Sequence, residues 1–329
     1  MKLRQIAGSL AAATGVVAAT NAALAWRADE LAPPLDGTNN TYQWRGFDIA
    51  YTEAGDPDDQ DVVLLHGLNA AGSSFEFRNV FDALAADHHV IAPDLPGFGR
   101  SDRPPIEYAA SHYTTFVADF LADAAEDPMV VASSHSGAYA TAAAADTDSV
   151  SELVLVCPTT AGFSGTRPLV GALVRTPVVG TALFNVATSK RAIRYFNADH
   201  GYHDESVVTE DVVEYHWRTA HQPGARFAAA SFFAGALDVD MDLGAELAAL
   251  DLPVTVVWGQ EATISPVADG RDIADAAGAR LVVFEDSDVQ PHVERPEAFL
   301  RDAVEPSAVV EGSKQSSGGE DVKHATDGA

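Results

Sequence analysis

The sequence predicts an α/β protein built on a mostly parallel β-sheet with helices on both faces. Short apolar runs rich in β-branched residues recur along the chain, and Gly, Pro or Asp residues bound them, as expected for strands buried on both faces. Helix-length segments separate most of these runs, which suits right-handed crossovers between parallel strands. The expected strands are Val62–Leu65, His89–Ala92, Met129–Ala132, Leu153–Cys157, Val254–Trp258 and Leu281–Phe284.

The remaining elements follow from the same patterns. Tyr42–Arg45 and Phe47–Thr52, joined at Gly46, predict a leading antiparallel hairpin. From Thr159 to Leu250 no strand-like run occurs, and about ninety residues are too many for a connecting loop. We therefore expect a core formed by residues 29–158 and 251–305, with a helical insertion at 159–250. The expected crossover helices are Phe75–Asp87, Tyr113–Glu126, Gly137–Ala145 and Val267–Ala277.

The charge balance excludes ordinary nucleic-acid binding. The chain has 20 basic and 48 acidic residues, a formal charge of −28, and no basic cluster longer than Lys190-Arg191. Only four of the basic residues are lysine, and this composition resembles proteins of salt-loving organisms, in which salt screens carboxylate repulsion. An acidic protein of an ordinary organism is the alternative. The single Cys157 excludes an intramolecular disulfide and a cysteine-based metal site.

Both ends of the chain differ from the core. Residues 1–28 contain an uncharged run from Ile6 to Trp26, whose 21 residues are long enough to span a bilayer as a helix. Ala23-Leu24-Ala25 also matches a signal-peptide cleavage site, so an anchor through residues 6–26, a cleaved signal and a soluble helix all remain open. We expect a membrane-anchored or exported protein rather than a cytoplasmic one. Residues 306–329 are poor in apolar residues and predict a disordered acidic tail.

A serine between a predicted strand and helix is the candidate nucleophile. Ala132-Ser133-Ser134-His135-Ser136-Gly137 leads from the Met129 strand into an alanine-rich segment. A serine there needs a sharp turn, which only small residues two positions away on either side permit. Ala132 and Ser136 meet this requirement for Ser134. The alternative frame, centred on Ser136, shortens the following helix and is less favoured.

With this serine turn and two further motifs, the chain resembles the α/β-hydrolase family over roughly Tyr42–Ala303. His66-Gly67-Leu68-Asn69 is similar to the family's oxyanion loop, and Asp94 to Asp102 is similar to its loop after the fourth strand. The resemblance implies a helical cap at residues 159–250 and an oxyanion hole formed by the backbone N–H groups of Leu68 and His135. We interpret Asp94 as a structural residue that forms the turn of this loop, a turn former.

The resemblance fails at two positions that catalysis needs. The family carries an acid three residues after the Trp258-Gly259 pair, where this chain has Ala262. It carries a base histidine three residues before His292, where this chain has Val289. Valine cannot accept a proton and alanine cannot orient an imidazole, so Ser134 needs another base.

Three replacements for the base are open. His292 with Glu261 forms a displaced set if the last loop shifts, His135 adjoins the serine, and the insertion contributes further histidines. For each histidine an ordinary surface or buried role is the more frequent case. The cap histidines are His200, His203, His216 and His221.

No metal or cofactor site is predicted. His200, His203, Asp204 and Glu205 lie close in sequence, but no motif fixes a further ligand, and a solvated loop is the simpler interpretation. Gly97-Phe98-Gly99 lacks the third glycine of a dinucleotide fingerprint.

Two functions therefore remain open at this point. One is a hydrolase that acts through Ser134, with an unconventional base, on a small hydrophobic ester or related carbonyl compound. The other is a catalytically impaired relative that binds a small apolar ligand or a partner at the membrane. The intact serine turn favours the first, Ala262 and Val289 favour the second, and the apolar residues of the insertion suit an apolar pocket in either case.

Overall fold

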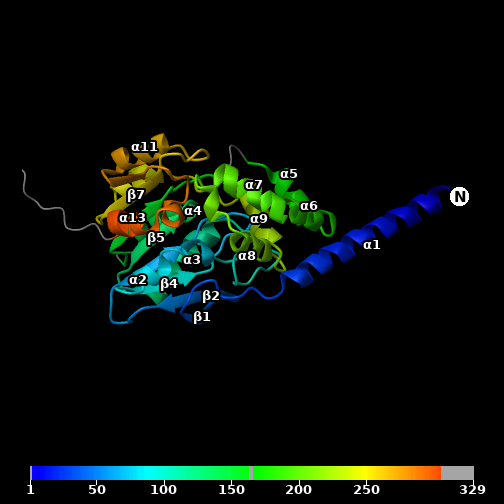
Figure 1. Ribbon diagram of the computed structural model, residues 1–329, viewed down its shortest axis with the longest axis horizontal. Coiled ribbons are helices and arrows are strands. Elements are labelled where there is room, and N and C mark those ends of the chain that lie inside the picture. The colour runs from blue at the N-terminus through cyan, green and yellow to red at the C-terminus, as the bar shows by residue number, and fades with distance from the viewer. Residues whose placement is uncertain (1, 148, 163–165, 305–329) are drawn as a thin grey trace, which may run out of the picture.

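A computed structural model describes residues 2–147, 149–162 and 166–304, so the tail expected at 306–329 lies outside the described residues. Eight strands form one sheet in the order β1-β2-β4-β3-β5-β6-β7-β8 (Figure 1). β1 pairs antiparallel with β2, β2 pairs antiparallel with β4, and the remaining pairs are parallel, which confirms the predicted fold class. The strands are β1 (Thr38–Trp44), β2 (Phe47–Ala54), β3 (Asp61–Leu65), β4 (His89–Pro93), β5 (Met129–Ser133), β6 (Glu152–Val156), β7 (Val254–Gly259) and β8 (Arg280–Phe284).

Alternating side chains of the central strands bury two separate apolar clusters. Val63 and Leu65 of β3 belong to a cluster with the aromatic residues of α3 (Ala110–Ala124). Val62 and Leu64 belong to the cluster on the opposite face of the sheet, which contains Phe77, Phe81 and Phe299. Because both faces are covered, these strands are apolar throughout rather than alternating with polar residues.

The order of the strands reverses between β3 and β5. Strand β4 lies on one side of β3 and β5 on the other, and Leu65 is in register with Ala132. In open α/β sheets, ligands bind beside the carboxyl ends of the strands at such a reversal. The loop after β3 and the turn after β5 therefore start side by side.

The helices of the core follow the predictions except after β3. In place of one helix over Phe75–Asp87, the chain forms the 3₁₀ turn η1 (Ser74–Phe77) and the short α2 (Phe81–Leu84). The segment is interrupted because Glu76 turns inward to hydrogen-bond the Gly67 N–H, and the Asn79 side chain donates to the carbonyl of Val293. The other core helices are α4 (His135–Asp146), α11 (Val267–Ala277), α12 (Pro291–Glu294) and α13 (Pro296–Phe299), followed by the π-turn η3 (Leu300–Val304).

The elements described between β6 and β7 are all helical, and they lie in the stretch 159–250 for which the sequence suggests a helical cap. The cap adjoins the core where the Phe75 ring stacks on Tyr215 at 4.3 Å and where the Tyr139 hydroxyl donates to the Leu237 carbonyl. The elements of this stretch are α5 (Pro168–Arg175), α6 (Val179–Ala187), α7 (Lys190–His200), η2 (Glu205–Val207), α8 (Glu210–Ala220), α9 (Arg226–Ala234) and α10 (Leu243–Ala248). The last of these elements, α10, packs on α4 and α11 of the core. The part of the insertion that stands away from the core therefore ends before α10.

The N-terminal helix α1 (Lys2–Ala28) projects from the body of the molecule (Figure 1). Its C-terminal end contacts the cap, where Leu24 and Ala28 pack with Ile193, Val213 and Trp217. Within the described residues, no single helix combines the length and hydropathy of a membrane span; α5 and α6 meet that criterion only as a pair, with a bend of 109° between them.

Candidate functional site

Ser134 occupies a strained turn between β5 and α4. Its backbone angles are φ 55° and ψ −127°, a conformation that residues other than glycine rarely adopt. Hydrogen bonds hold it there: its N–H donates to the Val156 carbonyl at 2.9 Å, and its carbonyl accepts from the N–H groups of Gly137 at 3.0 Å and Thr159 at 3.2 Å. The Ser134 side chain stays partly exposed, whereas Ser136 is buried and its hydroxyl donates to the His66 carbonyl at 2.6 Å. The geometry of a nucleophile turn belongs to Ser134.

The loop after β3 packs directly against this turn. A Cβ added at Gly67 would lie 3.3 Å from Ser133 Oγ, 3.4 Å from Ser134 Cβ and 3.4 Å from Glu76 Oε2. Leu68 follows in this loop, and His135 is the first residue of α4, so its N–H has no acceptor inside the helix. The segments that carry the two predicted oxyanion-hole N–H groups therefore meet at Ser134.

His66 fixes the shape of the same loop. Its Nε2 accepts a hydrogen bond from the Leu95 N–H at 3.0 Å, so the ring is the tautomer whose Nδ1–H donates to the Gly67 carbonyl at 2.9 Å. His66 thereby ties the loop after β3 to the loop after β4.

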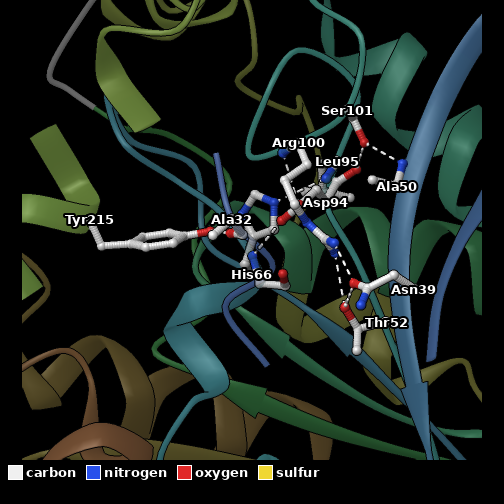
Figure 2. A network of polar contacts seen from close by, with 11 residues as sticks. Ala32, Asn39, Ala50, Thr52, His66, Asp94, Leu95, Arg100, Ser101 and Tyr215 are labelled. Atoms are coloured by element: carbon white, nitrogen blue, oxygen red, sulfur yellow. Dashed lines mark hydrogen bonds and ion pairs between the residues drawn. The ribbon is translucent and has the colours of Figure 1, made fainter. Parts of the chain in front are cut away.

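Asp94 organises the loop after β4 (Figure 2). It is fully buried, and its carboxylate accepts from the Ser74 N–H at 2.7 Å, the Arg100 N–H at 2.9 Å and Arg100 Nε at 3.1 Å. Arg100 continues to the Thr52 hydroxyl on β2 at 2.9 Å, and the Ser101 hydroxyl donates to the Asp94 carbonyl. Asp94 is a turn former, as the sequence predicts, and it holds the loop against the oxyanion segment.

Glu76 is a member of the site that the sequence analysis missed. The residue is buried, its Oε2 accepts from the Gly67 N–H at 2.8 Å, and its Oε1 lies 3.2 Å from His292 Nε2. Burial alone raises the pKa of this carboxyl, but His292, Ser133 and His66 together bring the pKa below its usual value. The one sign of Glu76 in the sequence is a charged residue between Phe75 and Phe77. In a segment with a helical pattern, such a residue is normally interpreted as part of the solvent-exposed face.

His292 and Glu261 have different interaction partners. The His292 ring is fully buried between Phe77, at 5.3 Å, and Phe299, at 5.7 Å, and its carboxylate partner is Glu76. Glu261 Oε2 accepts from the Ser287 N–H at 3.0 Å. Because α12 begins at Pro291 and turns the His292 ring toward η1, the carboxylate facing this histidine is Glu76 and not the expected Glu261.

The sequence profile described as the alpha/beta hydrolase family matches residues 62–303. The chain belongs to this family.

Individual relatives match over shorter stretches. The chain is 46% identical over 59 residues to an uncharacterized hydrolase of Saccharomyces cerevisiae. It is 40% identical over 77 residues to the 2-hydroxy-6-oxo-6-(2'-aminophenyl)hexa-2,4-dienoic acid hydrolase of Metapseudomonas resinovorans. These stretches cover 18% and 23% of the chain, and 20% and 26% of the two relatives. Among solved structures, a bacterial membrane phospholipase A has the same fold with a TM-score of 0.64 and 22% identity, over 93% of this chain and 100% of that one.

The positions at which the α/β-hydrolase resemblance implies an acid and a histidine share one apolar cluster. Ala262 is buried with Cys157, Trp258 and Val267, and Val289 packs against them. Burial raises the pKa of the Cys157 thiol to about 12, as expected in apolar surroundings. The two side chains thus contribute to the packing of this apolar cluster.

The His135 ring points away from Ser134 toward the cap. Its Nε2 lies 3.2 Å from Asp238 Oδ1, and the ring meets Phe232 edge-on at 5.6 Å. Burial lowers the pKa of His135, an effect that Asp238 only partly offsets, so the imidazole is neutral near pH 7. This orientation is compatible with the expected role of His135, which contributes its backbone N–H rather than its ring to the oxyanion hole.

The cap histidines have other partners. Burial and Arg78 lower the pKa of His216 to about 4, and this ring lies edge-on to Phe75 at 5.7 Å. His221 is hydrogen-bonded through Nδ1 to the Trp217 carbonyl, His200 lies beside Asp199, and His203 lies 4.0 Å from Asp286. Across residues 2–147, 149–162 and 166–304, no three His, Cys, Asp or Glu side chains are arranged to hold a metal ion.

A cavity of about 230 Å³ lies between α1 and the cap rather than at Ser134. Its lining includes Asn21, Phe184, His221 and Arg226, but not Ser134, Leu68 or His135. This cavity is therefore separate from the pocket expected above the nucleophile turn.

Proposed function

We propose that this α/β-hydrolase family member is a serine hydrolase that cleaves an ester or related carbonyl compound of a small hydrophobic molecule, with Ser134 as its nucleophile. The observation that carries the proposal is the strained backbone of Ser134, which costs about 1–3 kcal/mol and is held by three backbone hydrogen bonds. Strain of this kind is characteristic of a turn that presents a side chain to a substrate. The two sequence relatives are both named as hydrolases, which agrees with the proposal.

In the proposed reaction Ser134 Oγ attacks the substrate carbonyl carbon and forms a tetrahedral intermediate. The N–H groups of Leu68 and His135 stabilise the negative charge that develops on the carbonyl oxygen. Collapse of the intermediate breaks the bond to the alcohol oxygen, which receives the proton that Ser134 gave up, and leaves an acyl group on Ser134. Water then attacks this acyl group, which releases the carboxylic acid and restores the Ser134 hydroxyl. A low-polarity substrate suits the apolar ring of Phe232, which meets the His135 ring edge-on at 5.6 Å beside the Ser134 turn.

For the base we propose His292, oriented by Glu76. Glu76 contacts His292 through one oxygen and the oxyanion loop through the other, and Ser133 Oγ lies between this carboxylate and the turn. The pair thus replaces the missing histidine and acid at Val289 and Ala262, and Glu76 takes the role that the sequence suggests for Glu261. Because His292 is fully buried, proton transfer from Ser134 requires a water or the Ser133 hydroxyl as relay. We expect slow turnover, since loss of a directly bonded base typically reduces the rate by about 10⁴.

Hydrolysis of p-nitrophenyl acetate and butyrate in high salt tests the proposal. Ser134→Ala should abolish turnover, while Ser136→Ala, which alters the neighbouring serine, should retain it. His292→Gln and Glu76→Gln should each reduce kcat more than tenfold, because members of one catalytic unit do not act additively, whereas Glu261→Gln should leave kcat within twofold. Turnover that persists in Ser134→Ala would overturn the assignment. If the folded wild-type chain hydrolyses neither ester, the alternative of a catalytically impaired binding protein is supported instead.

A further inference from the structure

Exposed apolar side chains gather on one part of this molecule. Of the eleven large hydrophobic side chains that are exposed among the described residues, ten lie on α1, α5, α6 and α7, and the eleventh is Ile264. Helix α6 packs against α1, α5 and α7, and Figure 1 shows α1, α5 and α6 at the same end of the molecule. We call this surface the cap face; it consists of Val16, Trp26, Leu169, Val170, Leu173, Val179, Leu183, Val186, Tyr195 and Phe196.

The cap face is also the part of the chain without acidic residues. Although 48 of the 329 residues are Asp or Glu, none occurs between Glu152 and Asp199 or within residues 1–28. These two segments carry all ten residues of the cap face. Arg191 is exposed beside it, and Lys190 and Arg194 pair with Glu214 and Glu210 of α8. The rest of the chain is acidic and repels anions. The segments that carry the cap face, in contrast, hold only neutral and basic residues.

Asn21 joins α1 to the cap. Its Nδ2 donates to the Val178 carbonyl at 2.9 Å, and its Oδ1 accepts from Asn185 Nδ2 at 3.1 Å. Val178, with φ 60°, lies at the bend between α5 and α6. Asn21 therefore fixes α1 to the α5–α6 pair, and the exposed apolar residues of the three helices lie on elements that pack together.

We propose that the cap face binds the surface of a lipid membrane. Three observations favour lipid over a protein partner. Helices α5 and α6 together have the length and hydropathy of a membrane segment, bent by 109° as in a pair that enters and leaves one side of a bilayer. The uncharged run of α1 ends at Trp26-Arg27, and Trp26 is 85% exposed, a placement typical of the membrane interface. The segments that carry the cap face contain no carboxylate, and the neighbouring Glu210 and Glu214 are paired with Arg194 and Lys190, which reduces the repulsion that anionic lipids exert on the rest of the chain.

This proposal extends beyond an anchor at residues 6–26, because it makes the cap itself part of the membrane contact. It is independent of the chemistry at Ser134.

Flotation of the full-length protein with vesicles tests it. The vesicles are phosphatidylcholine alone or phosphatidylcholine with 30% phosphatidylglycerol, in a salt concentration at which circular dichroism shows the folded state. We expect the wild-type chain to float with both, and a Leu169→Glu, Val186→Glu variant to lose at least tenfold in its partition coefficient, because two exposed apolar side chains become charged. Ile264→Glu is the matched control, since Ile264 is 63% exposed but lies outside the cap face, and it should float as the wild type does.

Three results would overturn the proposal. A wild-type chain that does not float would show that the cap face does not bind lipid. A double variant that floats as well as the wild type would show that α1 alone is the anchor. If light scattering shows that the double variant loses a dimer while its flotation is unchanged, the cap face is an interface between two copies of this chain.

Discussion

At the scale of single residues, Ala262 and Val289 occupy the positions at which the α/β-hydrolase resemblance implies an acid and a histidine, and we propose that they limit catalysis by this chain. Both lie in the apolar cluster around Trp258, so an Asp and a His placed there would meet at the carboxyl ends of the strands. We expect Ala262→Asp with Val289→His to raise kcat/KM for p-nitrophenyl butyrate at least tenfold, and each single substitution to give no gain, because histidine and acid act as one unit. A buried ion pair in this cluster should lower stability by about 3 kcal/mol, which chemical denaturation measures. A folded double variant without gain would contradict a competent oxyanion hole.

Glu76 gives a second prediction at this scale, on stability. Its folded-state pKa lies below its usual value, so its ionised form stabilises the fold at pH values above the unfolded-state pKa, and this contribution is lost as the pH falls through the folded-state pKa. Glu76→Gln should therefore lower the free energy of unfolding by about 2 kcal/mol at pH 7, since it removes the buried carboxylate that accepts from the Gly67 N–H and lies 3.2 Å from His292 Nε2. The difference between the two proteins should shrink below about pH 4. A constant difference between pH 3 and 7, measured by urea unfolding, would contradict this role.

At the scale of elements, the loop after β4 depends on Gly99. This residue has φ 51°, and an added Cβ would lie 2.1 Å from Asp94 Cγ. Gly99→Ala should therefore displace the carboxylate that organises the loop and destabilise the protein by about 3 kcal/mol or more. Gly278→Ala is the matched control: its φ is 63°, but nothing lies within 4 Å, so only the backbone preference, about 1 kcal/mol, is lost. Equal unfolding midpoints for the two variants would contradict the organising role of Asp94.

The sequence predicts the strands of the sheet, but not the partners of several buried side chains. All six predicted parallel strands agree with the structure to within one residue at each end, because doubly buried strands leave continuous β-branched runs. The turn at Ser134 was predictable because its small neighbours are local. The partners of His292 and His135 were not, because Glu76 and Asp238 come from distant elements whose side-chain directions local patterns do not encode. The break in Phe75–Asp87 was missed for the same reason.

At the scale of the whole molecule, we expect the net charge of −28 to make stability depend on salt. At about 0.1 M salt the Debye length is about 10 Å, so neighbouring surface carboxylates repel, whereas at 1 M it is about 3 Å. We expect the thermal unfolding midpoint to rise by roughly 10 °C between 0.1 M and 3 M KCl, with most of the gain below 1 M. Sorbitol at matched water activity is the uncharged control and should give a smaller rise. A midpoint that follows sorbitol and KCl equally would assign the effect to solvent exclusion rather than to charge.

We propose that Ser134 is a nucleophile held by a strained turn, and covalent labelling of its hydroxyl tests this proposal. The folded protein in high salt is treated with a fluorophosphonate probe, digested, and the modified peptide is sequenced by mass spectrometry. We predict a single adduct on Ser134, absent in Ser134→Ala and retained in Ser136→Ala. An adduct on Ser136, or no adduct on a chain shown to be folded by circular dichroism, would contradict the claim.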